Sequence, residues 1–456
     1  MSSSFLFEEF PKVSPKAWKQ KIQVDLKGAD YNDTLVWESP EGIKVKPFYT
    51  EEDRKATPLG PLVPENPWKI GQAIHAANAT MANEKALDAL SRGAESLVFT
   101  VPSETINSLQ LLKGIDLTRV SVHLKLQFLS SAYVDQLLKA IDNPQALLYI
   151  HTDILGHLTG EGNWHTNAKE DHEALDKILA LDTAVPLLGV DMARYQNAGA
   201  TMVQQLAYAL AHANEYLNHV EDASGIQPTF TVAVGTNYFF EIAKLRALRM
   251  LWKSLAAAYQ NTHSCHILAL PTKRNKTLYD YNVNMLRTTT ECMAAVLGGA
   301  DTVCNLPYDA IYHKDNAFGE RMARNQLLIL KEESYFDKVH NPADGAYYIE
   351  SLTQQLAEKA LGLFKDIEKQ GGFLKQLKTH QIQKKIQESA QKELQNFEAG
   401  KEVLLGTNLY PNTEDRMNGA LEIFPFVKTR PRKTWIPPII EKRLAEKVEQ
   451  ERLEHE

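Results

Sequence analysis

Short, nearly continuous apolar runs alternate with longer stretches of mixed polarity from about residue 95 onward. Such runs are typical of strands that are buried on both faces of a parallel sheet. In two of the intervening stretches, 199–219 and 238–260, apolar residues recur every three to four positions, which predicts amphipathic helices. The predicted strands are SLVFTV (96–101), VSVHLKLQF (120–128), ALLYIHT (146–152), VPLLGVD (185–191), TFTVAVG (229–235), HILALP (266–271) and DTVCNL (301–306).

This repeat of strand and helix predicts an α/β fold, a (β/α)8 barrel over residues 91–355. Seven units are visible, and there is room for an eighth before about residue 350. A doubly wound open sheet is the alternative, but no Gly-x-Gly-x-x-Gly turn follows any predicted strand. In a barrel, the residues that follow the carboxyl ends of the strands form the active site, so those positions are the ones to inspect.

The two flanks have a different pattern. Residues 1–90 combine short patterned pieces with proline-rich turns, which predicts an extended N-terminal arm that lies over something larger. Residues 356–456 predict a helical C-terminal extension. Its last helix, 439–456, is highly charged and therefore predicts a mostly solvated face that packs on a partner along one thin stripe. The apolar residues of that helix are Ile439, Ile440, Leu444 and Val448.

Composition narrows the class of protein. A formal net charge of -7, without a basic patch, argues against a nucleic-acid partner. Three cysteines cannot form a disulfide framework, and the N-terminus has the acidic residues and prolines that a secretory signal lacks. No stretch approaches the roughly 20 apolar residues of a membrane span. We therefore expect a cytoplasmic protein that binds no membrane.

The segment after the third predicted strand contains His151, Asp153, His157 and His165. One interpretation is a metal site or a general-base cluster. The other is a long surface loop that happens to contain histidines. The spacing matches no zinc signature, and no His-Glu-x-x-His motif occurs, so the sequence favours the loop and predicts no metal site.

Charged residues follow two further strands. Asp191 and Arg194 follow the fourth, where an ion pair between them is at least as good an interpretation as an anion site. After the sixth strand, Lys273, Arg274 and Lys276 could face an anionic ligand, but such residues more often solvate a loop.

The stretch RTTTECMAAVLGGADTVCNLPYDA, residues 287–310, predicts a helix, two glycines and then the seventh strand. Cys304, Asn305 and Asp309 would lie at or after the carboxyl end of that strand. Cys304 lies in an apolar run and has no basic neighbour, which predicts a small buried residue rather than a reactive thiolate.

Several collinear segments resemble the acyl-CoA mutases that depend on adenosylcobalamin, methylmalonyl-CoA mutase above all. The stretch at 287–310 is similar to a signature of that family. PEGIKVKPFYTEED (40–53) resembles the family's PEGI-VKPLYT-ED segment, and NPWKIGQ (66–72) resembles RPWTIRQ. YQNAGATMVQQLAYALAHANEYL (195–217) is similar to the family's helix after the fourth strand. TNYFFEIAKLRALRMLW (236–252) resembles MNFYMEIAKMRAGRRLW, and NPADGAYYIESLT (341–353) resembles DPWGGSYYVEALT.

The resemblance also implies differences from catalytic members. In those members an Asp-x-His-x-x-Gly motif of a cobalamin-binding domain supplies the histidine that ligates cobalt, and no such motif occurs here. The family's substrate-binding histidine falls on Arg194, and its carboxylate-binding arginine falls on Glu161. The polar His-Thr-Asn after the seventh strand becomes Cys304, Asn305 and Leu306. A carboxylate at 161 would repel the substrate carboxylate.

On this resemblance the chain is expected to be a small subunit without catalytic residues and without cofactor or metal ligands. Glu161, Arg194, Cys304 and Asn305 would be degenerate family positions. Its partner would be a large catalytic methylmalonyl-CoA mutase subunit that holds adenosylcobalamin and is wrapped by the N-terminal arm.

Alternatives remain open on the same residues. The barrel could be catalytic with a separate cobalamin-binding subunit, through contacts built around Arg194 and Lys273. It could instead bind an acyl-CoA for regulation. Self-association of the isolated chain and the filling of the barrel centre are also open.

Overall fold

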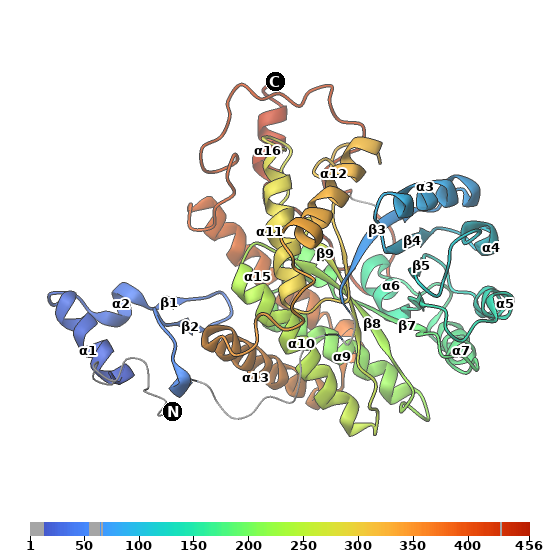
Figure 1. Ribbon diagram of the computed structural model, residues 1–456, viewed down its shortest axis with the longest axis horizontal. Helices are drawn as coiled ribbons and strands as arrows, with labels where there is room; N and C mark the ends of the chain where they lie inside the picture. The colour runs from blue at the N-terminus through green and yellow to red at the C-terminus, as the bar shows by residue number, and fades with distance from the viewer. Residues whose placement is uncertain (1–12, 54–63, 65–66, 429–430) are drawn as a thin grey trace, which may run out of the picture.

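An eight-stranded parallel sheet forms the centre of the computed structural model, which describes residues 13–53, 64, 67–428 and 431–456. The strand order is β6-β5-β4-β3-β10-β9-β8-β7. An isolated bridge between Thr152 and Leu188 joins β6 to β7 and closes the sheet, which confirms the (β/α)8 barrel (Figure 1). The strands are β3 Lys69–His75, β4 Ser96–Val101, β5 Ser121–Leu126, β6 Leu148–Ile150, β7 Leu188–Asp191, β8 Pro228–Val234, β9 His266–Pro271 and β10 Thr302–Cys304.

All seven predicted strands are present, and the eighth is not where the sequence placed it. It is β3, which precedes the other seven and lies inside the range 1–90 that was assigned to the arm. β3 pairs with β4 on one side and with β10 on the other, so the first and last strands of the barrel are neighbours. Its segment KIGQAIH was missed because Lys69, Gly71 and Gln72 interrupt the apolar run.

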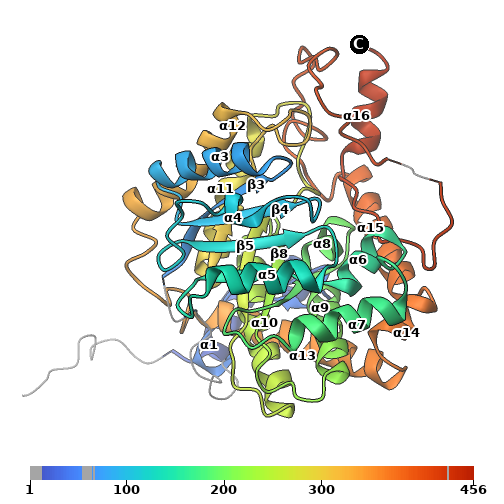
Figure 2. The same ribbon diagram turned by 90° about the vertical axis from the view of Figure 1, so that its right-hand side faces the viewer.

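Helices surround the barrel and bury their apolar stripes against it (Figures 1 and 2). One hydrophobic cluster lies between β7–β10 and the helices α9, α10, α11 and α13, and a second lies between β4–β6 and α3, α5 and α7. No helix among the described residues is long and apolar enough to cross a membrane. The helices of this layer are α3 Ala79–Ser91, α4 Ser108–Leu111, α5 Ser131–Ile141, α6 Ile154–Glu161, α7 Ala168–Leu179, α8 Ala193–Asn197, α9 Met202–His219, α10 Tyr238–Ala258, α11 Val283–Leu297, α12 Ala317–Leu328, the π-helix Ile329–Glu333 and α13 Tyr347–Lys369.

The N-terminal segment projects to one side of the barrel, at the left of Figure 1. It contains α1 Pro15–Asp25, α2 Tyr31–Leu35, the hairpin β1 Trp37–Glu38 and β2 Lys44–Val45, and a 3-10 turn Glu51–Asp53. The hairpin turn attaches the segment to the body, because Glu41 accepts hydrogen bonds from the backbone N–H groups of Met202 and Val203 and Ile43 is buried in the core. Helix α1 has no buried residue, and Trp18 and Val24 are exposed. Part of the predicted arm, residues 1–12, 54–63 and 65–66, lies outside the described residues.

The C-terminal extension contains α14 Phe373–Lys378, α15 Gln381–Glu398 and α16 Glu446–Leu453. The prediction of one solvated helix over 439–456 was wrong. Ile439 and Leu444 are buried, and their N–H groups donate to the carbonyls of Thr159 in α6 and of Arg274 after β9, at 2.7 and 2.8 Å. Because these backbone groups bond to the barrel, the chain stays extended and the helix begins only at Glu446.

Candidate functional site at the mouth of the barrel

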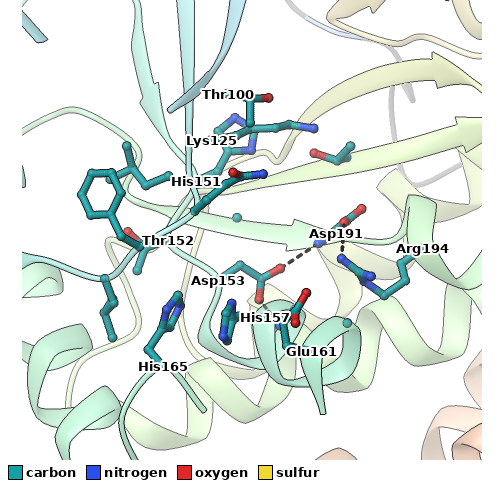
Figure 3. A pocket seen from close by; sticks show the side chains of 18 of the residues that line it. Thr100, Lys125, His151, Thr152, Asp153, His157, Glu161, His165, Asp191 and Arg194 are labelled. Atoms are coloured by element: carbon teal, nitrogen blue, oxygen red, sulfur yellow. Dashed lines mark hydrogen bonds and ion pairs between the residues drawn. The ribbon is translucent and has the colours of Figure 1, made fainter. Parts of the chain in front are cut away.

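A cavity of about 870 Å³ opens at the carboxyl ends of β4–β8. Lys125 of β5, His151 after β6, Asp191 of β7 and Lys273 after β9 line its wall, and α6 lines the opposite side (Figure 3). Its position at this end of the barrel is where the fold class places an active site. The cavity is therefore the candidate functional site.

Asp153 organises this site from the loop that enters α6. Its carboxylate caps α6 through the Gly156 N–H at 2.7 Å, accepts from the Asp191 N–H at 3.0 Å and bonds Nε2 of His212 at 2.8 Å. Burial alone would raise the pKa of Asp153, but the charge of His212 and the hydrogen bonds lower it to about 2. A carboxylate with so many partners is an anchor for three elements and a poor general base.

The histidines near α6 are brought together, and the surface-loop interpretation was wrong. Residues Ile154–Glu161 form a helix with buried side chains, and His157 and His165 stack on each other with ring centroids 3.5 Å apart. Burial, followed by the charge of His157, lowers the pKa of His165 to about 4. The described part of the chain contains no group of three or more His, Cys, Asp or Glu side chains that could hold a metal ion.

Residues 431–445 run across this end of the barrel, and we call this segment the strap. Its N–H groups at Trp435 and Ile436 donate to the Gly162 carbonyl, and the N–H of Lys442 donates to the Asn197 carbonyl. The strap therefore bridges the loops after α6 and α8.

Glu161 and Arg194, two residues that the sequence predicts to be degenerate family positions, form ion pairs with the strap. Nη1 of Arg194 lies 3.4 Å from Oε1 of Glu441, and its Nη2 lies 3.8 Å from Oδ2 of Asp191, so the predicted pair with Asp191 exists but is the longer one. Oε2 of Glu161 accepts from Nη2 of Arg432 at 2.6 Å. The charges of Arg194 and Glu161 are thus compensated inside the chain.

The three basic residues after β9 lie in different environments. Lys273 is exposed and lines the cavity. Arg274 is buried and donates to Glu393 of α15 and to the Lys442 carbonyl of the strap. Lys276 is buried and lies 2.7 Å from Glu291. The prediction that these residues solvate a loop was wrong for Arg274 and Lys276, which hold elements together.

Cys304, Asn305 and Asp309 do not line the cavity. Cys304 faces the barrel interior beside Val98 and Leu268, and burial raises the pKa of its thiol to about 12. Asn305 donates to the Ala323 carbonyl and to Gln326 at 3.0 and 2.9 Å, which anchors α12. Asp309 accepts from Asn316, the N-cap of α12. Of the four residues predicted to be degenerate family positions, only Glu161 and Arg194 line the cavity.

Aromatic rings fill the barrel axis below the cavity. His123 of β5 stacks on Tyr149 of β6 with centroids 4.6 Å apart, and Tyr149 lies 4.2 Å from the ring of His266 of β9. Nδ1 of His123 and Nε2 of His151 are 3.1 Å apart, so one imidazole donates to the other. Burial lowers the pKa of His123 and His151 well below 6.5 and that of His266 to about 4. The centre of the barrel is therefore closed by neutral rings.

Sequence reasoning missed Lys125, Arg432 and Glu441 as residues of the site. Lys125 carried a signal, because it is a charged residue within a predicted buried strand, two positions from His123 and therefore on the same face. Arg432 and Glu441 lie far along the chain in a segment without periodicity. Nothing in their local sequence indicates that they reach the mouth of the barrel.

Comparisons with known proteins agree with this architecture. The family model described as methylmalonyl-CoA mutase matches residues 103–451. The chain is 36% identical to the methylmalonyl-CoA mutase small subunit of Porphyromonas gingivalis, over 89% of this chain and 71% of that protein. It is 29% identical to the methylmalonyl-CoA mutase small subunit of Streptomyces virginiae, over 90% and 72% of the two chains. It is 28% identical to the methylmalonyl-CoA mutase of Rhizobium meliloti, over 87% of this chain and 64% of that protein's length. The chain belongs to the methylmalonyl-CoA mutase family.

Proposed function

We propose that this chain is the small, non-catalytic subunit of a heterodimeric methylmalonyl-CoA mutase. Its partner is a large subunit that binds adenosylcobalamin and interconverts succinyl-CoA and methylmalonyl-CoA. The observation that carries the proposal is the engagement of Glu161 and Arg194 by the strap. At the positions where catalytic relatives contact the substrate, this chain has side chains of different charge that are neutralised by its own residues.

The filled barrel axis supports the same conclusion. Isomerisation by a radical route needs a pocket whose polar groups hold the thioester and the carboxylate while a hydrogen atom moves. Here His123, Tyr149 and His266 pack ring against ring below the cavity. Rings packed in this way occupy the space below the cavity, and the hydrogen bonds of His123 and His266 go to His151 and Thr302.

The residues present do not fit adenosylcobalamin as a resident cofactor. The imidazoles at the mouth are engaged by other rings, since His151 bonds His123 and His157 stacks on His165. We therefore assign the cofactor to the partner and derive no step through it in this chain.

The contribution of this chain is then to stabilise the complex. The N-terminal segment supports this role, because Trp18 and Val24 of α1 are exposed and α1 buries no residue against the body. Trp18 stacks on Phe48, and we propose that this exposed surface of the N-terminal segment contacts the partner. The proposed compartment is the cytoplasm, which suits three free cysteines that are all buried.

A second candidate function is supported by the cavity itself. A space of about 870 Å³ remains at the mouth, and the cations of Arg194 and Lys273 both line it. That volume is within the range of small-molecule sites. It favours retention of an acyl-CoA, either for catalysis with a separate cobalamin-binding subunit or for regulation.

The test is co-purification of the tagged chain from its native cells, followed by a mutase assay with adenosylcobalamin. We expect a larger cobalamin-binding subunit to co-purify and only the complex to be active. Activity of the isolated chain with a small cobalamin protein would overturn the proposal and make this barrel the catalyst. Tight coenzyme A binding without turnover, measured by calorimetry, would favour the regulatory function.

Matched variants sharpen this test. Arg194→Ala in this chain should leave the turnover number of the purified complex unchanged, because the proposal gives Arg194 no contact with substrate. Alanine at the matching histidine of the large subunit should abolish turnover. A large loss from Arg194→Ala in a complex that assembles normally would contradict a non-catalytic barrel.

A further inference from the structure

Lys125 directs its ammonium group into the cavity at the mouth of the barrel. It lies on β5, where Val122 and Leu124 face the surrounding helices and His123 and Lys125 face the barrel interior. Figure 3 shows its side chain extending across the cavity without a dashed line to any neighbour. The strand backbone holds this side chain in place, since Lys125 pairs with Thr100 of β4 in the ladder.

The side chain is unusual among the buried and partly buried lysines because it has no direct partner. Lys244, Lys276 and Lys331 are buried, and each contacts a carboxylate at 2.6 or 2.7 Å. Nζ of Lys125 makes no hydrogen bond or ion pair with any residue that the structure describes. Lys125 is half-buried, and an amine that is partly withdrawn from water without a partner shifts toward its neutral, nucleophilic form.

The charges around Lys125 have opposing effects on its pKa. Burial lowers the pKa of Lys125, and the nearby charge of Lys273 lowers it further, while Asp191, Glu441 and Cys304 raise it. The net direction is downward. His123 and His151, which face the same space, are neutral and add no opposing negative charge.

A second cation in the cavity supplies a place for an anionic group. Lys273 lines the same space from the loop after β9, and its Nζ also has no hydrogen-bond or ion-pair partner within the described ranges. The guanidinium groups of Arg194 and Arg432 are already paired with acidic residues. Of the four basic side chains at the mouth, Lys125 and Lys273 are therefore the two available to a ligand.

We propose that Lys125 forms an imine with a small 2-oxo carboxylate whose carboxylate group is held by Lys273. The lone pair of neutral Nζ attacks the carbonyl carbon and forms the C–N bond. The carbonyl oxygen takes up the two protons that the nitrogen loses and leaves as water, and a C=N bond replaces C=O. This site does not depend on the proposed non-catalytic role, because that role assigns no part to either lysine, and Lys273 enters only the second candidate function.

The experiment uses the purified full chain with pyruvate and sodium cyanoborohydride, which reduces an imine to a stable amine. Peptide mass mapping then locates the adduct. We expect saturable labelling at Lys125 that Lys125→Met and Lys125→Arg both abolish. The arginine variant keeps the positive charge, so it can still show whether labelling requires Lys125 if the methionine variant does not fold. Lys139→Met is the control, because Lys139 is an exposed lysine paired with Asp135.

A second comparison tests the role of Lys273. Lys273→Met should lower the rate of pyruvate labelling by about tenfold, the scale of one charge-assisted contact. It should leave labelling by acetaldehyde, which has no carboxylate, nearly unchanged. Labelling spread over surface lysines, without preference for Lys125, would overturn the site. Equal losses with both probes would overturn the role of Lys273 as the anion anchor.

Discussion

Nη1 of Arg194 lies 3.4 Å from Oε1 of Glu441, which joins helix α8 to the strap that crosses the mouth of the barrel. Oε2 of the same glutamate accepts from Nδ2 of Asn197 at 3.0 Å. Glu441 thus fixes both ends of the short helix α8 to the C-terminal segment. Arg194, which is predicted to replace the family's substrate-binding histidine, therefore has a structural contact with the strap.

Glu441→Ala should loosen the strap. The variant loses a partly exposed ion pair and one hydrogen bond, and we expect a loss of about 1–2 kcal/mol in the free energy of unfolding. Urea denaturation measures this loss, and limited proteolysis should show faster cleavage within 431–445. Asp135→Ala is the control, because it removes an exposed pair with Lys139 and should cost less than about 0.5 kcal/mol. An unchanged midpoint of urea denaturation and unchanged proteolysis would show that Glu441 does not hold the strap in place.

Glu291→Gln should be much more damaging. Lys276 and Glu291 lie 2.7 Å apart and are both fully buried, so removal of one charge leaves the other in the core without compensation. The expected loss is about 3–5 kcal/mol, measured by urea denaturation. The double variant Lys276→Met/Glu291→Leu should recover most of it. Glu173→Gln breaks an exposed pair with Lys169 and serves as the control. A loss no larger than that of Glu173→Gln would show that the buried pair is dispensable.

The histidines of the barrel axis should make the protein less stable in acid. Burial holds the folded-state pKa of His266 at about 4, against 6.5 when unfolded. Between these values the unfolded chain binds the proton and the folded chain does not, so stability is complete above pH 6.5 and falls as the pH approaches 4. Each such histidine contributes a slope of about 1.4 kcal/mol per pH unit.

His266→Phe tests this slope, because it keeps an aromatic ring beside Tyr149 and removes the titrating group. The free energy of unfolding, measured by urea denaturation from pH 4 to 8, should depend on pH less steeply than in the parent chain, by about one proton. His340→Phe, at an exposed position, is the control. Parallel curves for parent and His266→Phe would mean that His266 titrates normally in the folded chain.

Glu41→Ala should detach the N-terminal segment from the body. The carboxylate accepts from the first N–H groups of α9 at 2.8 and 2.9 Å, and loss of such a cap costs about 1 kcal/mol. Hydrogen exchange should rise in residues 31–53 and stay unchanged in the barrel strands. Glu38→Ala, at an exposed position of β1, is the control. Unchanged exchange in the hairpin would show that Ile43 alone is enough to attach the segment.

The elements that could be predicted from the sequence are those whose burial requires a regular pattern of apolar residues. Strands β4–β10 are buried on both faces, which requires apolar runs, and α9 and α10 bury one stripe, which requires the period of a helix. β3 was not predicted, because it contains polar residues whose hydrogen-bond partners lie far away in the sequence. Lys69 donates to Ser121 at 2.8 Å, and Gln72 accepts from Arg324 at 2.8 Å. The family segment NPWKIGQ runs into β3, but nothing in its composition identifies a strand.

The sequence by itself determined the barrel class, seven of its strands and the family, and it predicted that Glu161 and Arg194 replace the family's substrate contacts. These features depend on local periodicity or on motifs, which are written along the chain. Only the tertiary structure decided that Arg432 and Glu441 compensate those two residues, that histidine and tyrosine rings close the barrel axis, and that Lys125 faces a cavity without a partner. The physical reason is that each of these depends on which side chains meet across the fold, and spacing along the chain does not specify that.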